Sequence, residues 1–374
     1  MSYSCVSLAK TAFAFAVFVG LASPSVSLAD TFSQTNLVSD VPGAATTDPN
    51  LKNPWGMSFS PTSPFWISNQ GSGTSTLYNG AGAITPLVVT IPGSSTPPSG
   101  PTGQVFNGTT GFDVSGSPAH FIFDTLNGTI DGWNGGATAV QMVSTPGAVY
   151  TGLALASNGG SNYLYAADST GQIRVFNSSF NPVSLGSFKD PDVTAGYVPF
   201  NIQLVGSDLY VTYAKLTAQG TAVPGSGGFV GVFTTGGVFL SQLTGGPLFA
   251  PWGVTQAPAG FGAYSNDLLV GNFGSGEILA YTPSGAYLGT LNGLNGQPIV
   301  NDFLWALDFR TGGAAGTNPD TLYFTAGINN QQDGLFGAIS LAPEPSAGLL
   351  ALVGLGALAL LGKRARKLTA RATQ

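Results

Sequence analysis

The sequence is poor in the residues that most enzymatic centres require. Its 374 residues include one cysteine, Cys5, and one histidine, His120. A structural zinc site needs four Cys or His ligands, and a Ser-His-Asp triad needs a histidine base beside its nucleophile. His120 stands inside the apolar run AHFIF, where we expect a partly buried strand residue. We therefore predict no catalytic residue and no metal cluster built on Cys or His.

Charged residues are also scarce, at 7% of the chain, against about a quarter in a typical soluble protein. Residues 30–342 contain five Lys or Arg and sixteen Asp or Glu, which gives a net charge of −11. They contain no basic cluster that could neutralise phosphates, so nucleic acid is not expected as a partner. Acidity of this degree mainly favours solubility.

Glycine (54) and proline (25) are abundant, whereas helix-forming windows are missing from the middle of the chain. Its apolar residues occur in short alternating runs rich in Val, Ile, Phe and Tyr. Gly, Asn and Ser separate these runs, as they do in turns between short strands. The pattern predicts an all-β fold.

The N-terminal segment is different. Lys10 precedes the apolar run TAFAFAVFVGLA, and small residues follow at Ser27 and Ala29. This order is typical of a secretory signal peptide, with cleavage after Ala29. An N-terminal anchor is the alternative, but the run is shorter than the roughly 20 residues that span a bilayer. Removal of residues 1–29 would also remove Cys5, leaving an exported domain without disulfides.

The C-terminal segment combines three features in a fixed order. They are the triplet Pro343-Glu344-Pro345, an uncharged span over about 346–362, and a basic cluster of Lys363, Arg364, Arg366 and Lys367. The basic residues predict that this end stays in the cytoplasm. Residues 343–374 resemble the PEP-CTERM sorting signal of Gram-negative bacteria. The resemblance implies recognition by an exosortase, a transient membrane anchor, and release to the cell surface. A plain single-pass anchor is the alternative.

Between these ends, one degenerate word recurs six times, with starts about 40 to 57 residues apart. A hairpin-like pattern follows each word after a turn. A repeat of this length with about four strands is typical of a propeller blade. The words are WGMSF (55–59), FDVSG (112–116), TGLAL (151–155), FNIQL (200–204), WGVTQ (252–256) and WALDF (305–309).

Six words predict one six-bladed β-propeller over residues 30–342, with each word on an innermost strand. Gly at the second position of a word would relieve crowding near the axis. The aliphatic residues at the third position would pack between blades; they are Met57, Val114, Leu153, Ile202, Val254 and Leu307. The pattern resembles NHL-like propellers, and the NPWG start and GSGEILAY hairpin resemble an uncharacterised bacterial propeller family that often has this tail.

The second position also suggests a ligand site, because two words have Asp113 and Asn201 there instead of a small residue. Both would lie near the central channel, with Trp55, Trp252 and Trp305 around an entrance. Aromatic faces with polar groups suit sugars or other small neutral ligands. The alternative is that the tryptophans pack blade against blade and that Asp113 bonds a backbone amide.

Other polar positions are expected to be structural. Short polar residues recur at one hairpin turn, where their side chains bond backbone groups; they are Asn69, Asp124, Asp168 and Asn272. The DPD triplet at 190–192 and the ND pair at 301–302 leave calcium open, although no EF-hand loop occurs. No cofactor is otherwise expected.

Two classes of function fit these observations. The first is a non-enzymatic binding or matrix protein at the cell surface or in exopolysaccharide. The second is a propeller hydrolase or lyase of the calcium-dependent lactonase type. Lactonases of that type have a cluster of carboxylates around a metal on the axis, usually including Glu. Glu277 is the only Glu before the tail and falls on an outer hairpin strand, which favours the binding protein.

Overall fold

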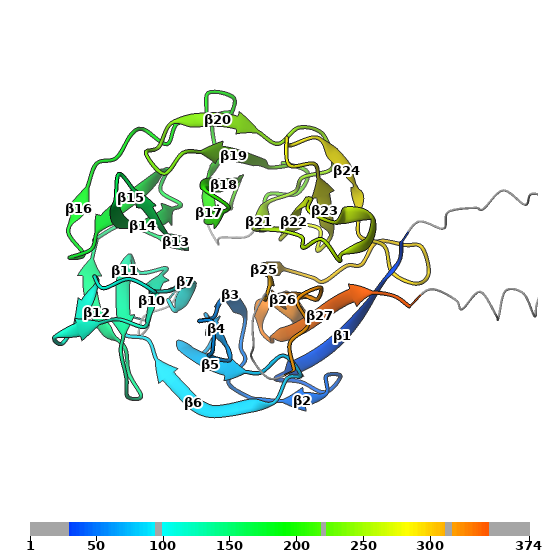
Figure 1. Cartoon of the computed structure of the whole chain (residues 1–374), viewed down its shortest axis with the longest axis horizontal. Coiled ribbons are helices and arrows are strands. Elements are labelled where there is room, and N and C mark those ends of the chain that lie inside the picture. Colours follow the sequence, from blue (N-terminus) through cyan, green and yellow to red (C-terminus); the bar gives the residue numbers. More distant parts are fainter. Residues whose placement is uncertain (1–29, 94–98, 218–221, 311–315, 344–374) are drawn as a thin grey trace, which may run out of the picture.

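In the computed structural model, six antiparallel sheets surround a central axis (Figure 1). The structure describes residues 30–93, 99–217, 222–310 and 316–343. Each sheet has at least four strands, and the innermost strand of each lies beside the axis. The predicted all-β, six-bladed propeller is therefore confirmed.

The blades follow one another along the chain. Blade 1 consists of β3 (Pro54–Ser58), β4 (Phe65–Asn69), β5 (Thr74–Tyr78) and β6 (Ile84–Thr90). Blade 2 consists of β7 (Pro101–Phe106), β10 (Phe121–Thr125), β11 (Thr129–Trp133) and β12 (Val140–Ser144). Blade 3 consists of β13 (Tyr150–Asn158), β14 (Ser161–Asp168), β15 (Gln172–Asn177) and β16 (Pro182–Val183).

The second half of the ring repeats this order. Blade 4 consists of β17 (Val198–Val205), β18 (Asp208–Ala214), β19 (Phe229–Phe233) and β20 (Phe239–Gln242). Blade 5 consists of β21 (Pro251–Gln256), β22 (Leu268–Asn272), β23 (Ile278–Tyr281) and β24 (Tyr287–Thr290). Two short helical turns, η1 (Gly262–Tyr264) and α1 (Ile328–Gln331), lie in loops.

Blade 6 closes the ring with strands from both ends of the domain. It contains β25 (Leu304–Phe309), β26 (Leu322–Ala326) and β27 (Leu335–Leu341), and then β1 (Phe32–Ser39) from the N-terminal side. β1 pairs antiparallel with β27, from Phe32 opposite Leu341 to Ser39 opposite Leu335. The short β2 (Thr46–Thr47) extends the sheet in parallel with β1. The first and last blade strands are thus hydrogen-bonded neighbours.

The predicted word of blade 2 was wrong. FDVSG does not form an inner strand: β8 (Asp113–Val114) pairs only with β9 (Ser117–Pro118) in a separate small hairpin. The inner strand of blade 2 is β7, so its word is TGQVF at 102–106. FDVSG has a bulky residue, Phe112, at its first position and an aliphatic residue, Val114, at its third, so it resembles the words of the inner strands. In the corrected register, Gly103 occupies the second position.

The second position forms a ring where adjacent inner strands approach most closely. Four blades have Gly there: a Cβ on Gly253 would lie 2.6 Å from the Trp305 carbonyl oxygen. A Cβ on Gly56 or Gly103 would meet the backbone of the next inner strand even more closely. Glycine is therefore required by close backbone approach, as the sequence predicted.

The third position packs between blades in five of the six words. Met57, Leu153, Ile202, Val254 and Leu307 are buried, and each belongs to a different hydrophobic cluster. Blade 2 has Gln104 at this position, while Val114 is buried beside its hairpin instead.

No helix in the described part of the chain is long and apolar enough to cross a membrane. The predicted signal peptide (1–29) and span (346–362) lie outside the described residues. So do Glu344, Pro345 and the basic cluster Lys363, Arg364, Arg366 and Lys367. Pro343 lies within the described residues: it is exposed, and one residue separates it from the end of β27 at Leu341.

Candidate site in the central channel

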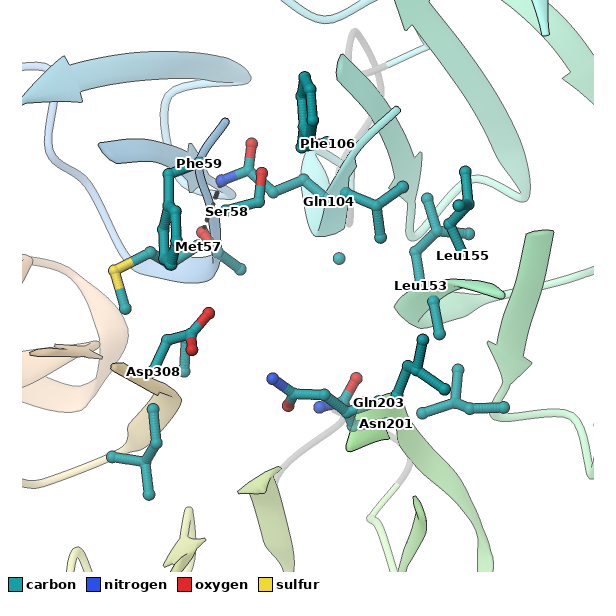
Figure 2. Close-up of a pocket in the computed structure, with 18 of the residues that line it drawn as sticks. Met57, Ser58, Phe59, Gln104, Phe106, Leu153, Leu155, Asn201, Gln203 and Asp308 are labelled. Carbon is teal, nitrogen blue, oxygen red and sulfur yellow. Dashed lines mark hydrogen bonds between the residues drawn. The ribbon is translucent and has the colours of Figure 1, made fainter. Parts of the chain in front are cut away.

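The central channel contains a cavity of about 310 Å³. The inner strands β3, β7, β13, β17 and β25 form its walls, and Trp252 from β21 completes the ring. Asp308 and Gln203 project into the cavity from blades 6 and 4, while Leu153 and Leu155 cover another side (Figure 2). Leucine side chains thus cover one side of the cavity, and polar side chains reach it from two other blades.

An aromatic cluster fills the channel beside this cavity, at the start of the inner strands. Trp55 stacks on Trp305 with ring centroids 3.6 Å apart, and Trp252 meets Trp305 edge-on at 5.7 Å. Phe200 and Phe273 join them at 5.8 and 4.3 Å from Trp305. These rings form one buried cluster, which we call the aromatic plug.

The three tryptophans therefore do not surround an open entrance, as one reading of the sequence expected. Their exposed fractions are 5% or less, because the three indole rings pack against one another. The indole N–H of Trp252 donates to the Thr151 carbonyl at 3.0 Å, and that of Trp305 to Asn53 Oδ1 at 3.2 Å. Trp252 alone of the three lines the cavity. Trp55 and Trp305 instead pack blade against blade, which was the alternative reading of the sequence.

Asn201 lies where the sequence placed it, on an inner strand and on the cavity wall. It is 3% exposed, and its Nδ2 donates to the Trp252 carbonyl at 2.8 Å. The side chain thus links β17 to β21 in the ring otherwise formed by glycines and Ala306. A Cβ on Gly152 would collide with the Asn201 amide, so the neighbouring glycine makes room for it.

Asp113 is not a channel residue. It lies on β8, its side chain is exposed, and the cavity lining does not include it. The prediction was wrong because it assigned FDVSG to the inner strand of blade 2, although Asp113 belongs to the exposed hairpin of β8 and β9. Asp113 is removed from the candidate site.

Asp308 was missed by the sequence reading and is the one ionisable side chain among the described residues that line the cavity. Burial raises its pKa to about 7, although the Phe309 backbone amide and the Arg310 charge both act to lower it. Arg310 is 1% exposed; its guanidinium lies 4.7 Å from the Phe59 ring centroid and donates to the Ser60 carbonyl at 3.1 Å. A carboxyl group that titrates near neutrality therefore faces the cavity.

Two further amides of the cavity, those of Gln203 and Gln104, were missed as well. Gln203 Oε1 accepts from the Val254 amide at 3.3 Å, and Gln104 Nε2 donates to the Gly56 carbonyl at 3.0 Å. Gln104 occupies the third position of its word and Gln203 the fourth, whereas the predicted polar exceptions were at the second position only. A comparison of the fourth positions would have revealed Asp308 and Gln203.

Comparisons with known proteins support this architecture. No family model matches the chain. It is 30% identical over 317 residues to uncharacterized protein L690 of Acanthamoeba polyphaga mimivirus, covering 79% of this chain and 82% of that protein. Uncharacterized protein R648 of the same virus is 31% identical over 317 residues, with 79% and 76% covered. The chain belongs to the family of these two proteins.

Among solved structures, the structure of streptogramin B lyase is similar to that of this L690/R648 family member, by which we mean the present chain. The TM-score is 0.50 and the sequence identity is 12%. The match covers 83% of this chain and 98% of that chain, and it supports the propeller fold alone. The resemblance to bacterial proteins with a sorting tail remains a prediction from the sequence.

The recurring turn residues of this L690/R648 family member are structural, as expected. All four are fully buried at the end of the second strand of their blades. Asn272 Oδ1 accepts from the Phe249 amide at 3.0 Å, and Asp168 Oδ1 accepts from the Val149 amide at 3.1 Å. Asp124 Oδ1 accepts from the Gly103 amide at 2.6 Å, whereas Asn69 donates to Thr76 Oγ1 at 2.9 Å. Three of them thus hold the segment that enters the inner strand.

His120 differs from expectation, because it is exposed rather than partly buried. It lies just before β10, with its ring 6.2 Å from that of Trp133. Asp190, of the DPD triplet, accepts from the Asp192 amide at 2.9 Å and from Gln242 at 3.1 Å. Within the described ranges, no three His, Cys, Asp or Glu side chains come together as metal ligands.

Proposed function

We propose that this protein is an exported propeller that binds a small, neutral, polar ligand in its central channel. The observation that carries the proposal is the cavity, which combines the Asn201 and Gln203 amides and the Asp308 carboxyl with an aliphatic wall. Small-molecule sites are mostly apolar, with a few placed polar groups, and occupy about 300–1,000 Å³. The cavity is at the lower end of that range, which suits a ligand about the size of one sugar ring.

The delivery of the protein is proposed from its sequence. The N-terminal signal pattern supports export across the inner membrane, and the Pro-Glu-Pro triplet, apolar span and basic cluster support sorting by an exosortase. The product would be a cell-surface or exopolysaccharide-matrix protein. Comparison of the released and membrane fractions by intact mass, for wild type and a Glu344→Ala, Pro345→Ala variant, tests this step.

A binding role fits the cavity better than a hydrolase or lyase role. Asp308 is its single ionisable lining group among the described residues. General acid–base chemistry in a propeller of the lactonase type would use several carboxylates around a metal. The name of streptogramin B lyase describes that protein, and its 12% identity brings no reaction to this one.

The binding proposal can be tested by calorimetry with purified full-length protein and a panel of neutral monosaccharides. We expect at least one to bind, and Gln203→Ala to weaken it about tenfold or more, because a lost polar contact in a desolvated site costs about 1–3 kcal/mol. Gln297→Ala is the matched control, since Gln297 is exposed on a loop outside the channel. Equal affinity of wild type and the Gln203 variant would remove the channel from the binding site.

A further inference from the structure

The interface between blades 1 and 2 combines an apolar contact with a set of buried polar atoms. Trp66 of blade 1 stacks on Phe121 of blade 2 at 4.2 Å, and Phe123 belongs to the same hydrophobic cluster. Beside them, several polar side-chain atoms have no hydrogen-bond partner: Trp66 Nε1, Ser68 Oγ, Ser75 Oγ, Gln104 Oε1 and Asp131 Oδ1. Buried polar groups normally have partners, so such a group of them requires an explanation.

Strand register places these atoms on facing surfaces. In blade 1, Ser68 lies directly opposite Ser75 across β4 and β5. In blade 2, Phe123 lies opposite Asp131 on one side and opposite Gln104 on the other. Side chains opposite one another share a face of the sheet, so both sets face the same interface as the Trp66–Phe121 stack. Gln104 crosses that interface, because its Nε2 donates to the Gly56 carbonyl of β3 at 3.0 Å.

Asp131 is the charged member of this group. Its exposed fraction is 0%, and Thr129 Oγ1 donates to its Oδ2 at 2.8 Å. In the described residues it forms no ion pair. A buried carboxylate without a counter-charge is strongly unfavourable, so it must either bind a proton or be balanced by a cation. Burial raises the pKa of Asp131 to about 7, as it does for Asp124, so the distinguishing feature of Asp131 is the set of unpartnered oxygens around it.

We propose that the interface between blades 1 and 2 binds one hard cation, sodium or calcium. Its ligands would be Asp131 Oδ1, Gln104 Oε1, Ser68 Oγ and Ser75 Oγ, with water completing the coordination and accepting the Trp66 N–H. Oxygen-only ligand sets select hard cations, whereas softer transition metals favour nitrogen or sulfur. One carboxylate among neutral oxygens distinguishes this site from a cluster of acids.

Asp124 provides a natural comparison within the same blade. It is equally buried, but its Oδ1 accepts from two donors on the inner strand of its own blade, Thr102 Oγ1 at 2.7 Å and the Gly103 amide at 2.6 Å. Two protein donors thus bond Asp124 Oδ1, and only its Oδ2 has no partner, whereas Asp131 receives a single hydroxyl donor. The interface beside Asp131 also contains the unpartnered oxygens of Gln104, Ser68 and Ser75, and a cation can bind such oxygens together with the carboxylate.

The site goes beyond the proposed function, but it touches the channel through Gln104, which also lines the cavity. A bound cation would hold the Gln104 amide oxygen and thereby fix one wall of the cavity. The cation is therefore expected to stabilise blades 1 and 2 and to organise the channel without contacting its ligand.

The test measures the melting temperature of full-length protein, first depleted with a chelator. Samples contain CaCl2, NaCl, KCl or choline chloride at matched ionic strength. We expect calcium or sodium to raise the melting temperature by about 3 °C or more above choline, since binding to the native state alone stabilises it. Elemental analysis of the sample purified without chelator should then give about one calcium per chain if calcium is the ion.

Three variants keep the assignment falsifiable. Asp131→Asn should abolish the cation-dependent increase, whereas Asp124→Asn should retain it even if its own melting temperature is lower. Ser75→Ala should reduce the increase partially. A wild type with equal melting temperatures in all four salts, or an unchanged increase in Asp131→Asn, would overturn the proposal. In either case the Asp131 carboxyl would be protonated or hydrated instead.

Discussion

The two ends of the central channel are formed by the same inner strands and yet differ completely. At the start of these strands, Trp55, Trp252 and Trp305 interlock into the aromatic plug. Two or three residues further along, the side chains diverge around a cavity that contains Gln203 and Asp308. The ring of glycines and Asn201 separates the two ends. Residue size at each level thus decides whether the channel is filled or open.

The difference teaches that one strand can serve stability and binding at once. In WALDF, Trp305 is fully buried in the plug, while Asp308 faces the cavity only three residues later. The plug fixes the spacing of the blades, and the cavity uses that spacing. Substitutions in the plug should therefore alter the free energy of unfolding, whereas substitutions at the open end should alter binding and pH dependence.

The largest effect is expected from Trp305→Ala. Removal of a fully buried Trp leaves a void among Trp55, Trp252 and Phe273, and such truncations cost about 3–5 kcal/mol. The free energy of unfolding from urea titration measures it. Val238→Ala is the control, because Val238 is 62% exposed and should change stability by less than about 0.5 kcal/mol. Similar values for both variants would mean that the plug does not support the fold.

A smaller loss is expected from Gly152→Ala, in the ring between the two ends. Its new methyl group would collide with Asn201, and overpacking of this kind costs about 1–3 kcal/mol. Gly236→Ala adds the same methyl group where the nearest atom is 3.6 Å away, so it should be tolerated. Urea titration of the pair shows whether close strand approach is the reason for glycine. Equal stability of the two variants would contradict it.

At the open end, Asp308→Asn should reduce the pH dependence of the free energy of unfolding. The folded pKa of Asp308 is raised to about 7, so the unfolded chain releases this proton more easily. Its contribution to stability is complete below the unfolded pKa of about 4 and is lost as pH rises through 7. The variant should therefore lose less stability than wild type between pH 4 and pH 8. Asp302→Asn, at an exposed position, should follow the wild-type profile.

The smallest effect is expected from Asp113→Ala, outside the channel. Because Asp113 is exposed on the β8 hairpin, its loss should change stability by less than about 0.5 kcal/mol. Ligand affinity should also remain at the wild-type value, whereas Gln203→Ala weakens it. A clear loss of affinity in the Asp113 variant would show that the ligand reaches beyond the cavity.

The sequence predicted the repeat and the ring because backbone requirements leave a local signature. Gly56, Gly152 and Gly253 each recur after a bulky or polar residue, and strand convergence explains their spacing. The third-position aliphatics follow from packing between blades in the same way. These features depend on neighbours at fixed positions in every blade, so they repeat along the chain.

The site was harder to predict because it does not repeat. Asp308 occurs in one blade, and its altered pKa depends on burial by side chains from other blades. The tryptophans were predicted to surround an entrance because the sequence does not show how closely the inner strands bring the three indole rings together. Asp113 was misplaced because FDVSG matches the word pattern locally, whereas β7 is identified only by its pairing with β10.

The closure of blade 6 determines how the propeller would carry a mechanical load. β27 lies between β1 and β26, with Ile339 opposite both Gln34 and Leu322, so it is held along both edges. β1 has a full partner on one edge only, because β2 is two residues long. A pull applied beyond Leu341 must break two hydrogen-bond ladders together, whereas a pull at Phe32 peels one. The strand that continues toward the C-terminal tail is therefore the one better built to bear tension.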